Sequence, residues 1–116
     1  MRHLYFLLFS ILSCSAFAQV SGDNVLDRTV LHEVHFEYIQ GDFYLELQNN
    51  FRPFDPFDPG PYTMANVTID GERVDSVGVR LKGFTSFQGS ALKNPFKIDF
   101  NRFVPGKRLD GLRKLN

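Results

Sequence analysis

The chain has 116 residues, of which 43% are hydrophobic and 13 are phenylalanine. This composition excludes a disordered chain, and the length allows one small domain without a large core. Lysine and arginine together number 13, as do aspartate and glutamate, so the formal net charge is zero.

The zero total hides a strong segregation of charge along the sequence. Residues 19–79 carry eleven acidic and three basic side chains, a balance of −8, whereas residues 80–116 carry nine basic and two acidic side chains, a balance of +7. Such asymmetry favours a local anion-binding surface in the second part over a general affinity for nucleic acid. We therefore expect no nucleic-acid partner.

The first eighteen residues have the pattern of a secretory signal peptide. Arg2 supplies a positive start, Leu4 to Leu12 form an apolar run, and Ala16-Phe17-Ala18 places small residues where a signal peptidase cuts. The apolar run is shorter than the roughly 20 residues that a permanent membrane anchor needs. We predict a signal peptide over residues 1–18, cleavage before Gln19, and an exported mature chain without a transmembrane segment.

Cys14 is the only cysteine and lies inside this predicted leader. Two interpretations stay open: an ordinary leader residue, or a lipobox over residues 11–14 in which Cys14 is lipidated and anchors a lipoprotein. With the first, the mature chain has no thiol. Disulfides, thiolate zinc sites and cysteine nucleophiles are then excluded.

The first predicted elements of the mature chain are a strand and a short helix. Val34, Phe36 and Tyr38 alternate with polar residues, which is typical of a half-buried strand. Asp42 is placed to cap a helix that runs to about Asn49. The proline-rich stretch at 51–62 then predicts a loop held by phenylalanine contacts. The alternative, a calcium site on two aspartates of that stretch, has too few oxygen ligands.

An antiparallel meander is predicted over residues 62–101. Alternating apolar residues indicate three strands, at 65–69, 77–81 and 96–100, and Asp70-Gly71 is a strong hairpin-turn signal between the first two. Leu109, Leu112 and Leu115 predict one more packed element after a turn at Pro105-Gly106. The expected fold class is α+β: an antiparallel β-meander with a short helix.

Two segments resemble the zinc-protease motif and the Walker phosphate-binding loop, but their residue spacing excludes both. His32-Glu33-Val34-His35 has one residue too few for the zinc-protease motif, and a strand would turn the two histidines to opposite faces. Residues 83–90 lack the lysine of a phosphate-binding Walker loop, and their glycine spacing is one too long. With no cysteine and only two histidines in the mature chain, a Ser-His or Cys-His hydrolase also has little support.

The basic residues of the predicted hairpin at 77–100 carry most of the chemical content. Arg80 and Lys82 alternate with the apolar residues of one strand, and Lys97 does so on the next. The connection between them contains Gly83, Ser86 and Gly89, which allow close backbone approach and add a hydroxyl. Fixed cations and backbone N–H groups converging from one side suit phosphate. A plain solvated sheet face stays open as the alternative.

Three blocks in order resemble the CotH kinase family, secreted atypical protein kinases named for spore coat protein H. They are residues 77–87 (VGVRLKGFTSF), 93–100 (KNPFKIDF) and 109–116 (LDGLRKLN), preceded by 67–74 (VTIDGERV). The resemblance covers about residues 30–116. Phe84-Thr85 departs from the small polar pair usual in that family after Lys-Gly, and Asn94 replaces a frequent second lysine.

The resemblance implies that residues 19–116 form the N-terminal part of a CotH kinase-like domain, similar to a kinase N-lobe. It implies ATP with Mg²⁺ or Mn²⁺ as cofactor and Ser/Thr of surface or secreted proteins as the phosphate acceptor. We expect the catalytic and metal-binding acids beyond Asn116, so residues 19–116 alone are expected to be inactive. The candidate nucleotide-binding residues are Lys97 first, then Arg80, Lys82 and Lys93, with Gly83, Ser86 and Gly89 as backbone-approach positions.

Two further points stay open in the sequence. Asp99 either orients Lys97 or forms a plain surface ion pair with it. The alternative function is a non-catalytic extracellular β-rich interaction module, in which the same meander binds a protein partner or a polyanion.

Overall fold

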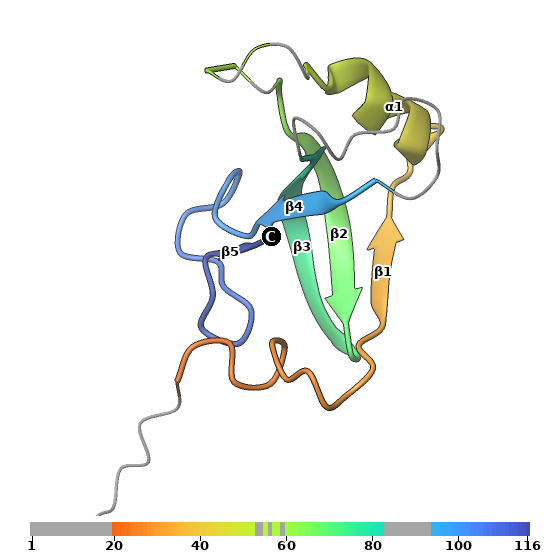
Figure 1. Cartoon of the computed structure of the whole chain (residues 1–116). Helices are drawn as coiled ribbons and strands as arrows, with labels where there is room; N and C mark the ends of the chain where they lie inside the picture. Colours follow the sequence, from red (N-terminus) through yellow and green to blue (C-terminus); the bar gives the residue numbers. More distant parts are fainter. Residues whose placement is uncertain (1–19, 53–54, 56, 59, 83–93) are drawn as a thin grey trace, which may run out of the picture.

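The computed structural model describes residues 20–52, 55, 57–58, 60–82 and 94–116. The predicted signal peptide with Cys14, and the candidate residues Gly83, Ser86, Gly89 and Lys93, lie outside the described residues. The elements in chain order are β1 (Val34–Glu37), α1 (Phe43–Asn50), β2 (Thr63–Ile69), β3 (Glu72–Leu81), β4 (Phe96–Asp99) and β5 (Lys114–Leu115) (Figure 1).

The five strands form one antiparallel sheet in the order β1-β2-β3-β4-β5. With one short helix, the fold class is α+β, and the predicted antiparallel meander is confirmed. The fifth strand extends it: Leu115 pairs with Ile98, and the buried Leu109 lies just upstream, in a bridge with Leu112. The predicted last packed element is therefore a turn followed by a short strand.

The turn between β2 and β3 has the geometry that its sequence predicts. Asp70 and Gly71 both have positive φ, at 50° and 86°, and a two-residue hairpin turn of this type favours Asp-Gly because both residues need the left-handed region. The carboxylate of Asp70 also accepts the backbone N–H of Glu33 at 2.8 Å. This contact ties the turn to the start of β1.

Helix α1 begins where the sequence places its cap. The side chain of Asp42 accepts the backbone N–H of Leu45 at 3.0 Å, which satisfies one of the free donors of the first turn. Leu47 is buried against the sheet, and the ring of Phe43 lies 5.4 Å from that of Phe36, centroid to centroid. The helix thus covers the end of the sheet opposite the β2–β3 turn (Figure 1).

One apolar core lies on the inner face of the sheet. Val67, Val77, Val79, Leu81 and Phe100 are its fully buried centre. The rings of Phe36 in β1 and Phe96 in β4 approach to 5.3 Å between centroids, although two strands separate β1 from β4 in the sheet order. The sheet is therefore curled around this core, and Figure 1 shows β4 crossing in front of β3.

The described residues of the proline-rich loop make several polar contacts of short range. Phe51 packs against the core, but Phe57 is 97% exposed, so the predicted phenylalanine contacts are wrong for that residue. Asp55 accepts the backbone N–H groups of Phe57 and Asp58, and Asp58 forms an ion pair with Arg52. Short-range turn contacts of this kind are typical of aspartate in loops.

Candidate anion-binding face

Arg80 and Lys97 lie directly opposite each other on neighbouring strands. The register of β3 and β4 pairs Val79 with Ile98 and Arg80 with Lys97. Because side chains alternate between the two faces of a sheet, the first pair enters the core and the second projects from the outer face. The sequence prediction that these two cations share a non-core face is confirmed.

The environment of Lys97 disfavours its positive charge. Burial, followed by the charges of Arg80 and Lys114, lowers the pKa of Lys97 below its ordinary value, and Lys82 contributes in the same direction. The charge of Asp99 opposes this shift only in part. Like charges directly opposite on antiparallel strands also destabilise the pair. A bound anion would favour the charged form of Lys97 and reduce its repulsion with Arg80.

Arg80 has a buried donor without an acceptor. Its Nε atom makes no hydrogen bond although it is screened from solvent, and it is the one such side-chain atom among the residues that the structure describes. The guanidinium carbon lies 4.6 Å from the centroid of the Tyr62 ring. Buried polar groups in native proteins are almost always paired, so Arg80 Nε is an exception among the described residues.

Tyr62 and Arg102 extend the cationic face. The guanidinium carbon of Arg102 lies 5.0 Å from the same ring centroid. Burial raises the pKa of Tyr62, and a cation over the face of an aromatic ring is attracted by the ring quadrupole. Both side chains lie above Gly78, where a Cβ atom would come within 2.8 Å of the Cβ of Arg102 and 3.0 Å of a ring carbon of Tyr62.

Asp99 does not pair with Lys97, and that interpretation of the sequence is corrected here. Asp99 is buried, and its carboxylate forms an ion pair with Lys114 at 3.6 Å and accepts the backbone N–H of Asn101 at 3.1 Å. The reason is the register of β4 with β5, which places Lys114 directly opposite Asp99. Residues two apart on one strand, such as Asp99 and Lys97, are further from each other than a cross-strand pair.

The basic face is defined by five cations from three parts of the chain, namely Arg80, Lys82, Lys97, Arg102 and Lys114. Of these, the sequence identified the first three; Lys82 follows β3 directly, and its backbone N–H donates to Pro95 at 2.9 Å. It missed Arg102, Lys114 and the aromatic Tyr62. The one available signal for Tyr62 was its position next to β2, two residues before Met64, which pairs with Gly78.

An apolar groove lies on the other face of the sheet. Its volume is about 370 Å³, and it is lined by Val34, Phe36, Phe96, Ile98, Leu115 and Asn116. Ile98 and Phe96 alternate with Lys97, so the groove and the basic face are on opposite sides of β4. A single small ligand cannot occupy both.

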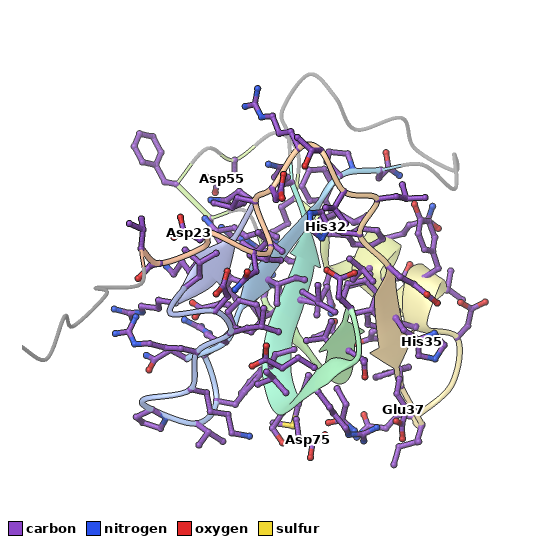
Figure 2. All side chains as sticks on the ribbon, turned by 90° about the horizontal axis from the view of Figure 1, so that it is seen from below. Asp23, His32, His35, Glu37, Asp55 and Asp75 are labelled. Atoms are coloured by element: carbon purple, nitrogen blue, oxygen red, sulfur yellow. The ribbon has the colours of Figure 1, made fainter. Side chains whose placement is uncertain are left out.

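His32 and His35 are the two histidines among the described residues, and they lie apart (Figure 2). His32 has Nδ1 2.6 Å from the Asp70 carboxylate and Nε2 2.7 Å from the backbone oxygen of Asp27. Figure 2 shows His35 well apart from His32, beside Glu37 on β1. Within the described residues, no three metal-ligating side chains of His, Cys, Asp or Glu gather at one place.

The face offers fixed cations and an unpaired donor, a combination suited to ligands with several negative oxygens. In the described part of the chain, no helix has the length and apolar character needed to span a membrane. No protein-family model, no curated protein and no solved structure matches the sequence or fold of this chain.

Proposed function

We propose that the chain is the N-terminal, nucleotide-binding part of an exported CotH-like protein kinase. In this proposal the basic face holds the phosphates of ATP, with Mg²⁺ or Mn²⁺, and phosphate passes to Ser/Thr of surface or secreted proteins. Support comes from the order of the three sequence blocks, from the leader-like first eighteen residues, and from an α+β sheet that carries cations on its outer face.

The observation that carries the proposal is that Arg80 and Lys97 face each other on the outer face and that Arg80 Nε has no hydrogen-bond partner among the described residues. Two cations face each other across β3 and β4, and the neighbouring carboxylate of Asp99 forms an ion pair with Lys114. A buried guanidinium donor without an acceptor costs about 1–3 kcal/mol of desolvation. Phosphate oxygens would accept that donor and lower the repulsion between the two side chains.

The residues present fit the phosphate part of a nucleotide better than its metal. Mg²⁺ takes carboxylates and phosphate oxygens in an octahedral arrangement, and the described residues hold no suitable acidic cluster. Acidic residues elsewhere in a longer chain would have to hold the ion. This chain's own contribution is then to bind and orient the phosphates through Arg80, Lys97 and the neighbouring cations.

Phosphate transfer tests the proposal directly. The full-length protein is incubated with radiolabelled ATP, Mg²⁺ or Mn²⁺ and a secreted or surface protein fraction, and labelled Ser/Thr is the expected product. The matched variant is Arg80→Gln, and the control is Arg73→Gln, which removes an equal charge whose partners are Glu37 and Asp75. We expect the first to lose transfer and the second to keep it.

The same experiment separates the alternative function. Absence of both transfer and nucleotide binding by the unchanged protein would overturn the kinase proposal. If the protein then bound a polyanion such as heparin through Arg80 and Lys97, the non-catalytic interaction module would take its place.

A further inference from the structure

Two guanidinium groups share one aromatic ring at the edge of the basic face. The guanidinium carbons of Arg80 and Arg102 lie 4.6 Å and 5.0 Å from the centroid of the Tyr62 ring. Both distances are inside the range of cation–π attraction, about 6 Å. Tyr62 directly precedes β2, Arg80 belongs to β3 and Arg102 follows β4, so the ring joins cations from separate segments.

The backbone below this group is shaped to receive it. Gly78 has no Cβ atom. A Cβ at this position would lie 2.8 Å from the Cβ of Arg102 and 3.0 Å from a carbon of the Tyr62 ring. The backbone N–H of Arg102 also donates to the carbonyl of Asp99 at 3.4 Å. Arg102 and the Tyr62 ring therefore pack on β3 at Gly78, and the backbone of Arg102 is hydrogen-bonded to Asp99 at the end of β4. These contacts restrict the movement of the Arg80 and Arg102 side chains.

Such restriction matters for anion binding. A free arginine side chain loses rotamer entropy when it is immobilised. An arginine already held against a ring loses less on binding, and its planar fork keeps several donors in a fixed geometry. Arg80 also keeps a buried Nε donor with no acceptor in the described part of the protein.

We infer that Tyr62 is a positioning residue that holds Arg80 and Arg102 for a ligand with two or more adjacent phosphoryl groups. The inference rests on the proposed function and deepens it, because it gives Tyr62 a role in that site and assigns Arg80 and Arg102 jointly to adjacent phosphoryl groups. A ligand with one carboxylate has too few oxygens to satisfy two guanidinium forks and the Lys97 ammonium together. A di- or triphosphate has enough.

Calorimetric titration of the full-length protein with inorganic triphosphate tests this inference. Tyr62→Leu removes the ring but keeps an apolar side chain, and Tyr62→Phe keeps the ring without the hydroxyl. We expect Tyr62→Leu to weaken triphosphate binding about fivefold and Tyr62→Phe to stay within about twofold of the unchanged protein. Thermal unfolding of each variant checks that the chain remains folded.

A residue that acts through another has a distinctive signature in a double-mutant cycle. The effect of Tyr62→Leu should shrink clearly when it is introduced into Arg80→Gln, because the residue being positioned is then absent. An equal effect in both backgrounds, or equal affinities of the leucine and phenylalanine variants, would overturn the inference. Orthophosphate binding as tight as triphosphate binding would overturn the ligand class.

The failures of the two proposals are distinguishable. If triphosphate does not bind to the unchanged protein but ATP does, this inference falls and the proposed function stands; if neither triphosphate nor ATP binds and no phosphate is transferred, both fall. If triphosphate binds and Arg80→Gln weakens it while Tyr62→Leu does not, the phosphate site stands and only the role of Tyr62 is contradicted.

Discussion

The acidic part of the chain and the basic face both contain cations, but these cations differ in whether a carboxylate pairs with them. In the acidic part, Arg73 pairs with Glu37 and Asp75, and Arg52 pairs with Asp58. Figure 2 shows Glu37 and Asp75 near each other at the end of the molecule away from Asp55. On the basic face, Arg80 and Lys97 make no ion pair within the described residues. Cations with partners support the fold, whereas cations facing one another are available to a ligand.

The largest expected effect is the difference in triphosphate affinity between a variant of the basic face, Arg80→Gln, and a variant of the acidic part, Arg73→Gln. Arg80→Gln should weaken triphosphate binding about 10- to 100-fold, because a hydrogen bond to a charged group contributes about 1.5–3 kcal/mol. Arg73→Gln changes net charge equally and should leave the affinity within about twofold. Calorimetric titration at one fixed salt concentration measures both. Equal losses in the two variants would mean that overall charge, and not the basic face, attracts the anion.

A side chain at position 78 should displace Arg102 and Tyr62 and lower the stability of the protein. Gly78→Ala places a methyl group against the Cβ of Arg102 and the ring of Tyr62, and overpacking of this kind costs about 1–3 kcal/mol of stability. Thermal unfolding measures the loss. In an Arg102→Gly background, which removes both colliding atoms of Arg102, the same substitution should cost less. Additive losses would show that the stack does not rest on Gly78.

Neutralising Lys97 should have opposite effects on stability and on binding. Lys97→Gln removes a like-charge pair across two strands, which is worth about 0.2–1 kcal/mol, so the Tm of the ligand-free protein should rise by about a few degrees. Triphosphate binding should weaken in the same variant. The exposed Arg108 provides a control for net charge, and Arg108→Gln should change neither. A fall in Tm for Lys97→Gln would contradict the proposed repulsion between the charges of Lys97 and Arg80.

The smallest predicted effect belongs to His32 in the acidic part. Both ring nitrogens face acceptors, the Asp70 carboxylate and the Asp27 backbone oxygen, so only the protonated ring satisfies both. These contacts raise the pKa of His32, with the hydrogen bond to Asp70 as the main cause, and the same bond lowers the pKa of Asp70.

The sign of the pH dependence follows from these directions. The contribution of His32 is fully present below its ordinary pKa of about 6.5 and is lost as pH rises through the raised value in the folded state. That of Asp70 is lost as pH falls through its lowered value. Thermal unfolding of the unchanged protein and of His32→Gln between about pH 5 and 9 should show a Tm difference that fades at high pH. A constant difference would contradict the paired, protonated state.

Local chemistry made much of the fold predictable. Asp42 ahead of an apolar pair predicted the helix, Asp70-Gly71 predicted the hairpin, and strict alternation predicted that Arg80 and Lys97 leave the core. Each of these rests on neighbours in sequence or on a period of two, which a chain shows without its tertiary structure.

The remaining parts of the site depend on contacts between distant segments. Asp99 pairs with Lys114 because β5 adds to β4, and a strand of two residues carries no periodic signal. Tyr62 and Arg102 meet only because Gly78 leaves room for them. The apolar groove exists because the sheet curls until Phe36 reaches Phe96, which no local pattern predicts.

We expect Arg80 and Lys97, which form no ion pair within the described residues, to take up phosphate, whereas Arg73, which pairs with two carboxylates, does not. The most direct measurement follows the arginine Nε–H signals of the isotope-labelled full-length protein by NMR during a titration with inorganic triphosphate. We predict a large, saturable shift of the Arg80 signal and none for Arg73, which its two carboxylates already engage. Equal small shifts of both signals, or an unmoved Arg80 signal at saturating triphosphate, would contradict the account.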